Sequence, residues 1–240
     1  MNTDHHLAFL GIATGETGSR CVVCGRNIDS DNYHVDRYNR RACTCHNVQC
    51  CCFCGRIIGN DAVDVPYFGT ACGRCGSERS YDELETIRTF CYSFFASHKL
   101  YLPAVRICLL SAEEMQLAHG SPEGTPRGVA SRNSPGYRID LMRQLSRIGM
   151  AKTLAHELAH LWQWHRNIDA PHTYCEGFCN LVASLVVSQI SKTEALVILH
   201  QMMENPDPAY GAAFRELKIV YDIHGWQTLI EAMKTFQDRS

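Results

Sequence analysis

Residues 151–166 read AKTLAHELAHLWQWHR, and this stretch has the strongest helical pattern in the chain. Its apolar residues recur at helical spacing: Leu154, Leu158 and Leu161. A helix over 151–166 is therefore predicted. His156 and His160 are four residues apart on it, so both imidazoles share one face and can bind one metal ion. Glu157 is rotated about 100° from His156, so we expect it to act as a general base on a metal-held water.

A third protein ligand is needed for a hydrolytic zinc site. The pattern HExxHxxGxxH fails, because Gln163 and Arg166 occupy its Gly and His positions. The remaining candidates for this ligand are His165, Asp169, His172 and Glu176. We favour Glu176, because Glu176, Asn180 and Ala183 form a helical stripe that can face the first helix. Two histidines and one glutamate leave an open position for water, as hydrolysis requires.

A peptidase also needs a hydrogen-bond donor for the developing oxyanion. The candidates are Tyr210, His200, His224 and Arg215, and spacing alone does not choose among them. Two cysteines, Cys175 and Cys179, bracket Glu176 and are expected to pack in the core. Cys179 lies three residues from Glu176 on a similar helix face, so a place near the metal stays open.

The remaining periodicity predicts an α+β chain. Helices are predicted at 81–98, 176–190, 192–203, 212–221 and 226–236, and strands at 105–110 and 128–131. The rest of the stretch between Gly120 and Gly136 is predicted to form loops, because it is rich in Pro, Gly and Ser.

Ten of the fourteen cysteines lie within the first 75 residues, mostly in CxxC pairs. Such pairs indicate metal ligands rather than disulfides in a reduced compartment. Two sets of four ligands have nearly equal internal spacers of eighteen and seventeen residues. The sets are Cys21, Cys24, Cys43 and His46, and Cys51, Cys54, Cys72 and Cys75. Each set fits a closed tetrahedral zinc site, which is structural.

An internal repeat is visible, because CVVCGRNI at 21–28 is similar to CCFCGRII at 51–58. The repeat indicates two similar half-modules in tandem, one for each ligand set. The ligand register stays open, because neighbouring cysteines can replace Cys43 or Cys51 after a shift. These neighbours are Cys45, Cys50 and Cys52. The symmetry of the spacers favours the two sets given above.

Composition narrows the classes of partner and location. The net charge of −2 gives no long-range attraction to phosphate backbones or anionic lipid, so neither nucleic acid nor a membrane is an expected partner. The sequence lacks an apolar run of membrane-spanning length and a basic region before its first apolar stretch. We therefore expect a cytoplasmic protein.

Three motifs carry a family resemblance: HELAHLWQ at 156–163, CEGFC at 175–179 and DPAYGAAFR at 207–215. With them the chain resembles the LIM-domain zinc metallopeptidases that ubiquitin activates and that limit organ growth in plants, and more closely their shorter bacterial relatives. The resemblance covers most of residues 20–236 and implies a LIM-like double zinc module followed by a mostly helical zincin-like domain of the gluzincin type. It implies Glu176 as the third ligand and favours Tyr210 as the donor. The first ligand set differs from a LIM motif, because its second pair, Cys43 and His46, reads CxxH where a LIM motif has HxxC.

These patterns predict an N-terminal segment at 1–19, a LIM-like or zinc-ribbon module at 20–79 and a peptidase domain at 80–240. The predicted function is a zinc metallopeptidase that hydrolyses peptide bonds in protein or peptide substrates, with one catalytic and two structural zinc ions. An endopeptidase is favoured, and exo-cleavage stays open. The alternative is a zinc-stabilised adaptor with a vestigial peptidase domain, because the front module is of a kind that binds protein partners.

Overall fold

The computed structural model describes residues 11–14, 20–28, 32–122, 124–133 and 136–237. The predicted segment 1–19 therefore lies outside the described residues, apart from 11–14. Proximity of Cα atoms divides the chain into two units. The first consists of Met1–Arg79, Ser111–Thr125 and Arg143–Ser146, and the second of Ser80–Leu110, Pro126–Met142 and Arg147–Ser240. Within the described ranges, no helix is both long and apolar enough to cross a bilayer.

The first unit contains two small antiparallel sheets and two short helices. The strands are β1 (Gly11–Thr14), β2 (Asn32–Val35), β3 (Arg41–Cys43), β4 (Ala62–Val65) and β5 (Gly69–Cys72), and the helices are α1 (Gly73–Gly76) and α3 (Ala112–His119). One sheet has the order β1-β2-β3 and the other pairs β4 with β5. Among the described residues, the buried apolar cluster of the first half-module is small: Ile28, Tyr33 and Ala42 lie beside Cys21, together with Ile57 from the second half-module.

The sequence repeat is also a repeat of backbone structure. The amide of Cys21 donates to Arg26 and the amide of Gly25 to Cys21, at 2.8 Å each. The same two bonds recur thirty residues later, from Cys51 to Arg56 and from Gly55 to Cys51, at 2.8 and 2.9 Å. Both glycines have φ near +74°, a left-handed conformation that suits glycine. Each CxxCG segment therefore forms the same tight knuckle.

The second unit is built on a three-stranded sheet covered by helices. Its strands are β6 (Val105–Leu110), β7 (Gly128–Asn133) and β8 (Gly136–Met142), in the order β6-β8-β7. β6 pairs with β8 in parallel and β7 pairs with β8 antiparallel. The helices are α2 (Tyr81–Ser97), α4 (Arg147–His165), α5 (His172–Ser188), α6 (Thr193–Glu204) and α7 (Ala213–Lys234).

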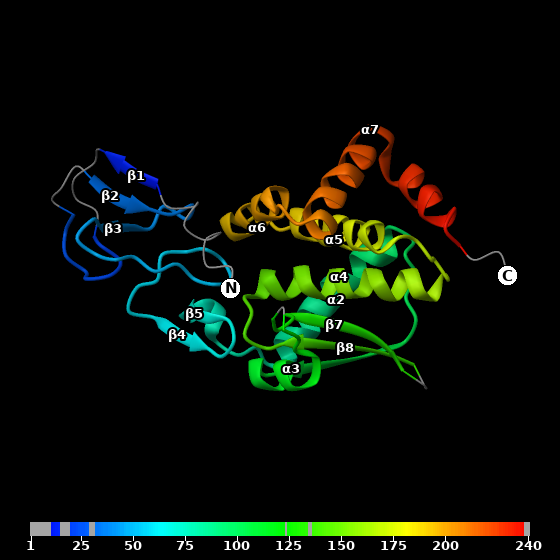
Figure 1. The fold of residues 1–240 in the computed structure, drawn as a ribbon, viewed down its shortest axis with the longest axis horizontal. Helices are drawn as coiled ribbons and strands as arrows, with labels where there is room; N and C mark the ends of the chain where they lie inside the picture. The colour runs from blue at the N-terminus through cyan, green and yellow to red at the C-terminus, as the bar shows by residue number, and fades with distance from the viewer. Residues whose placement is uncertain (1–10, 15–19, 29–31, 123, 134–135, 238–240) are drawn as a thin grey trace. The chain divides into compact units, whose positions relative to one another are not determined.

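Helix α4 is the central layer of this unit, between the β7–β8 sheet and α5 (Figure 1). Its apolar stripe is almost completely buried, since Leu154, Leu158 and Leu161 are each 0% exposed. Burying leucines of this kind stabilises by roughly 1.5–3 kcal/mol per side chain. A helix held by packing on two sides is a rigid support for the side chains that project from it.

The predicted elements agree with the structure in type, and the differences lie at boundaries and in short segments. α5 begins at His172, after Pro171, so Glu176 lies in its second turn instead of at its start. The predicted helices 212–221 and 226–236 are the two halves of α7, which is kinked at Gly225 with φ +77°. The strand β8 and the helix α3 were not predicted, and β7 is longer than expected.

Candidate metal centres

Three predicted ligands converge between α4 and α5. The Nε2 atoms of His156 and His160 are 3.2 Å apart. The two carboxylate oxygens of Glu176 lie 3.1 Å from Nε2 of His156 and 3.4 Å from Nε2 of His160. All three side chains are at most 14% exposed. The packing of α4 against α5 thus brings two imidazoles and one carboxylate from consecutive helices around one point.

The hydrogen bond of Asn180 determines which nitrogen of His156 faces that point. Oδ1 of Asn180 lies 3.0 Å from Nδ1 of His156, and its Nδ2 donates to the carbonyl oxygen of Tyr210 at 2.7 Å. With Nδ2 used as the donor, Oδ1 must accept from Nδ1–H. Nε2 of neutral His156 then presents a lone pair.

A cation fits between these groups. Oε2 of Glu176 is buried and has no hydrogen-bond donor. It faces the Nε2 lone pair of His156, and two lone pairs so close together repel unless a proton or a metal ion lies between them. Burial raises the pKa of Glu176, but His156 and His160 outweigh it and hold this pKa well below its usual range. The donor set of two imidazoles and a carboxylate matches hydrolytic zinc.

For Cys179, the sequence left open whether the side chain packs in the core or lies near the metal. It is fully buried, as expected of a core residue, but its Sγ lies 3.3 Å from Nδ1 of His160. Gln163 Oε1 lies 3.3 Å from the same nitrogen. His156, His160 and Cys179 form a group of possible ligand atoms within 4.8 Å of one another. Because Sγ faces Nδ1 while Glu176 faces Nε2, cysteine and glutamate lie on different edges of the His160 ring.

Glu157 is also buried and is held by the sheet. Its Oε2 accepts a hydrogen bond from the backbone N–H of Ala130 on β7 at 2.8 Å. A Cβ on Gly128 would lie 3.1 Å from Oε1 of Glu157 and 2.5 Å from Thr153, so glycine lets β7 approach this carboxylate closely. The strand therefore fixes the orientation of the predicted general base.

Tyr210 lies over the ring of His156, one of the two candidate imidazole ligands. Its ring is stacked 6.1 Å from that of His156 at an interplanar angle of 27°. It belongs to a π-helical turn, η2 (Pro208–Ala212), capped by Asp207, whose side chain accepts from the amides of Ala209 and Tyr210 at 2.8 Å. Burial, and then the carboxylates of Glu176 and Glu157, raise the pKa of Tyr210 to about 12. The hydroxyl therefore stays protonated and is able to donate.

The other candidates are placed elsewhere or have other partners. Arg215 donates to the carbonyls of Met203 and Asn205 at 3.0 and 2.7 Å, so it anchors the loop before η2. His200 lies 3.1 Å from Glu204 on α6. His172 reaches Glu176 at 3.5 Å but is 74% exposed. The backbone amide of Asp169 donates to Phe236, and His165 and His224 are exposed.

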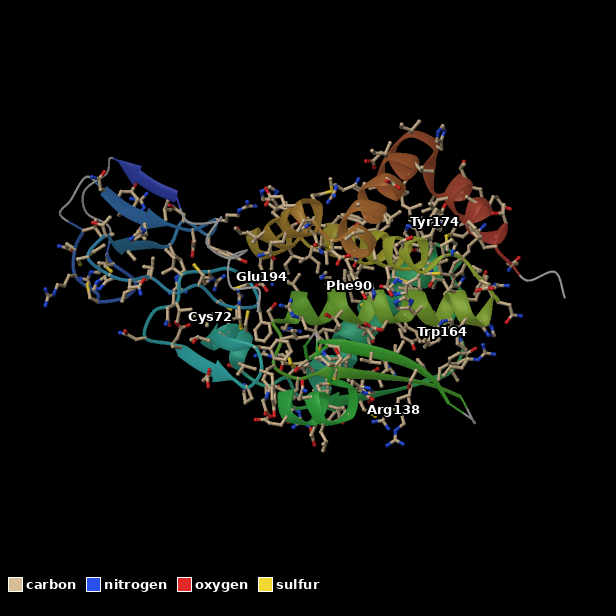
Figure 2. The ribbon with its side chains drawn as sticks, viewed as in Figure 1. Cys72, Phe90, Arg138, Trp164, Tyr174 and Glu194 are labelled. Atoms are coloured by element: carbon tan, nitrogen blue, oxygen red, sulfur yellow. The ribbon has the colours of Figure 1, made fainter. Side chains whose placement is uncertain are left out.

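Two tryptophans of α4 have different surroundings. Trp162 is buried and stacks on Phe178 at 5.3 Å. Trp164 lies near the C-terminal end of α4 (Figure 2) and stacks on His160 at 6.0 Å. Trp164 is therefore a neighbour of the candidate ligand His160, whereas Trp162 packs between helices.

In the first unit, the structure gathers the predicted ligands into two groups. Ligand atoms of Cys21, Cys24, Cys43 and His46 lie within 4.8 Å of one another, and so do those of Cys51, Cys54, Cys72 and Cys75. All fourteen cysteines are free thiols. The neighbours Cys45, Cys50 and Cys52 belong to neither group.

The first group has the chemistry of a metal site. Nε2 of His46 is buried without a hydrogen-bond partner, which leaves its lone pair to a cation. Burial raises the pKa of Cys21, but the backbone amides of Cys43, Cys24 and Val23 outweigh it and lower this pKa to about 6. The amide of Cys43 lies 3.4 Å from Sγ of Cys21. A thiolate is the form that binds zinc.

The second group is more deeply buried, and all four of its cysteines are 3% exposed or less. Hydrogen bonds from Cys52 and then Cys54 hold the pKa of Cys51 well below its usual range. The thiol of Cys75 has a raised pKa, above all because of its hydrogen bond with Cys51. Four buried thiols cannot all ionise without a cation between them, and a Cys₄ set is consistent with zinc.

Sequence reasoning missed the residues that support the ligands. Asn180 was assigned only to a helix stripe, although its spacing of four from Glu176 on α5 was the available signal. Gln163 was used only to reject a longer motif. The sequence could not indicate Ala130, because it holds Glu157 through its backbone amide, which every residue except proline has.

No family model, no curated protein and no solved structure matches the chain.

Proposed function

We propose that the protein is a zinc-dependent peptidase that hydrolyses peptide bonds in protein or peptide substrates. The observation that carries the proposal is the convergence of Nε2 of His156, Nε2 of His160 and the Glu176 carboxylate, at 3.1 to 3.4 Å from one another. Three protein ligands leave a position for water, which distinguishes a hydrolytic site from a closed one.

The residues around this point have separate tasks. When bound, zinc supplies Lewis-acid chemistry that polarises a peptide carbonyl and makes water more acidic. Glu157, held at Oε2 by Ala130, has its second oxygen available to accept a proton from the attacking water and return it to the leaving nitrogen. The protonated hydroxyl of Tyr210 donates to the developing oxyanion.

The test separates metal binding from catalysis. The purified full chain should contain about three zinc ions, one for each ligand set. Glu157→Gln should retain all of them and lose at least about a thousandfold in the rate of casein cleavage, because it removes the base but no ligand. Glu176→Gln should lose one zinc ion and all activity. Unchanged cleavage by Glu157→Gln would defeat the proposal.

One observation favours the second candidate, an adaptor whose third zinc site is structural. Cys179 belongs with His156 and His160 to a group of possible ligands. If His160 bound the ion through Nδ1, the nitrogen that Sγ of Cys179 faces, a bond from the thiolate would close the coordination sphere. Cys179→Ser decides between the two. In the peptidase it keeps the third zinc and measurable activity, whereas in the adaptor it loses the third zinc and the parent protein cleaves nothing.

A further inference from the structure

A cavity of about 530 Å³ lies in the second unit. It is lined by residues at the C-terminal ends of α2 and α4 and by the half of α7 that follows the Gly225 kink, coloured red in Figure 1. Cavities that bind small molecules in proteins have volumes of roughly 300–1,000 Å³. The cavity is therefore large enough for a metabolite.

The cavity faces away from the metal ligands. Trp162 of α4 lines it and is two residues beyond His160, which corresponds to a rotation of about 200° around the helix axis. Arg166, four residues after Trp162, also lines it, on the same side. The zinc ligands are absent from its lining. A ligand here would thus not occupy the position proposed for the peptide.

Its lining is cationic. Lys99, Arg166 and Lys234 are its charged members and all three are exposed, while no acidic side chain of the described residues lines it. Lys234 pairs with Glu231 at 2.8 Å. Within the part of the chain that the structure describes, the side chains of Lys99 and Arg166 have no hydrogen bond or ion pair. Two positive charges therefore remain for an anionic ligand.

Lys99 is held in an unusual backbone conformation. Its φ is +58°, in the left-handed region directly after α2, where glycine or asparagine is the favoured residue. A lysine in this conformation carries a cost that glycine would avoid. The local backbone therefore does not account for a lysine at position 99. Its side chain lies at the cavity instead.

The walls offer aromatic rings. Trp162 is buried and already stacks on Phe178, so the accessible rings are those of Trp226 and Tyr101. The indole of Trp226 is half-buried and donates to the carbonyl of His98 at 3.2 Å, and Tyr101 is 62% exposed. Aromatic faces bind planar rings by stacking. We propose that this cavity binds a small molecule that carries a phosphate group on a planar ring, the class to which nucleoside monophosphates belong, with Lys99 and Arg166 holding the phosphate.

The test measures binding to the full-length zinc-loaded protein at fixed ionic strength. Two of the chain's three tryptophans line the cavity, so intrinsic fluorescence reports on it, and titration calorimetry provides a second readout. Adenosine monophosphate should bind saturably. Adenosine and inorganic phosphate should each bind at least about tenfold more weakly, since each lacks half of the contacts.

Two variants test the assigned cations. Lys99→Gly removes the charge and relaxes the left-handed backbone, and Arg166→Gln removes the other charge. Each should weaken binding of adenosine monophosphate about ten- to a hundredfold. Lys99→Gly should melt no lower than the parent, which excludes unfolding as the cause. The matched control is Lys218→Gln, which removes a half-buried charge that pairs with Asp222 outside the cavity.

Three results would overturn the proposal. The first is the absence of saturable binding at millimolar adenosine monophosphate. The second is binding that survives both variants, because the nucleotide then binds elsewhere, for example at a zinc ion. The third is inorganic phosphate binding as tightly as adenosine monophosphate, because the rings then contribute nothing. Cleavage activity enters none of these measurements, so they stand apart from the proposed peptidase function.

Discussion

At the residue scale, the orientation of His156 depends on a single amide side chain. Asn180 accepts from Nδ1 of His156 with Oδ1 and donates to the carbonyl of Tyr210 with Nδ2. It therefore connects a proposed ligand on α4 with the turn that holds the proposed oxyanion donor.

Replacing Asn180 separates these two connections. Asn180→Ala should weaken zinc binding at this site about 10- to 100-fold, because the imidazole loses the partner that fixes its tautomer. Asn180→Asp should keep zinc affinity, since a carboxylate also accepts from Nδ1–H, but should lower stability, because it cannot donate to Tyr210. Competition with a chromophoric chelator and urea unfolding measure the two effects. Equal zinc affinity in the alanine variant and the parent would contradict this assignment.

Lys152 gives a prediction for the pH dependence of stability. It is half-buried on α4, and burial, followed by the nearby charge of Arg127, lowers its pKa from 10.5 to about 8. Below pH 8 both the folded and the unfolded chain carry the proton, and the folded state bears the full cost of the charge. Between pH 8 and 10.5 the folded state has released its proton and the unfolded state has not, so this residue makes stability rise with pH.

Lys152→Met should therefore be more stable than the parent at pH 7, and the difference should shrink as pH rises from 8 to 10.5. Denaturant unfolding of both proteins across this range measures it, and taking the difference removes the effect of other groups that titrate there. The control is Lys192→Met, which changes an exposed lysine for which no such trend is expected. A constant difference across the range would show that the charge of Lys152 is not the cause.

At the element scale, two glycines allow α5, η2 and α7 to lie close together. A Cβ on Gly211 would lie 1.9 Å from the carbonyl oxygen of Asn205, and one on Gly177 would lie 2.8 Å from the carbonyl carbon and Cβ of Ala213. Glu176 precedes Gly177 and Tyr210 precedes Gly211. Gly177 thus lets α5, which carries the proposed third ligand, approach the start of α7, and Gly211 lets the turn that carries the proposed donor approach the segment before it.

Gly177→Ala should destabilise the protein by about 1–3 kcal/mol through overpacking. Without this contact, alanine inside a helix would stabilise by about 0.5–1 kcal/mol, so the sign of the change tests the packing. Gly211→Ala should be more severe, because its obstacle is backbone. Adding Ala213→Gly to Gly177→Ala should restore part of the stability. Urea unfolding measures all four proteins, and a stabilising Gly177→Ala would refute the close approach.

The elements show what the sequence can and cannot predict. α4 was predictable because its leucine stripe, its propensity and its HELAH motif agree. α3 was missed although Ser111 and Glu114 form a capping box that is visible in the sequence. β8 was missed because the loop signals before it masked a short apolar run. The π-helical turn at Tyr210 depends on Asp207 and on the close approach of Asn205, which only the folded chain brings together.

At the scale of the whole molecule, we expect the two units to depend on metal to different degrees. The second has helices packed on a sheet, with α4 buried on both sides. The first half-module has a small apolar cluster around Cys21, and buried Asp36 ties it to the second half-module by accepting from the amide of Ile57 at 2.7 Å. Folds of this small size rely on their metal for stability.

Removing zinc should therefore affect the units unequally. Chelation should abolish amide protection across residues 20–79, while α2, α4 and α5 should stay protected and most helical circular dichroism should remain. Hydrogen exchange with mass spectrometry measures this for each segment, before and after zinc is added back. Uniform loss of protection along the chain, or none in residues 20–79, would show that metal does not hold the first unit.

The division of the chain has a consequence for modularity. The first unit includes Ser111–Thr125 and Arg143–Ser146, which are separated in sequence from Met1–Arg79 by parts of the second unit. The unit that contains the cysteine-rich region is consequently not one contiguous stretch of sequence, so recombination could not transfer it as a single fragment. A gene fragment ending at residue 79 would leave two stretches of the first unit behind, so exchange of this region between proteins would require three coordinated splices.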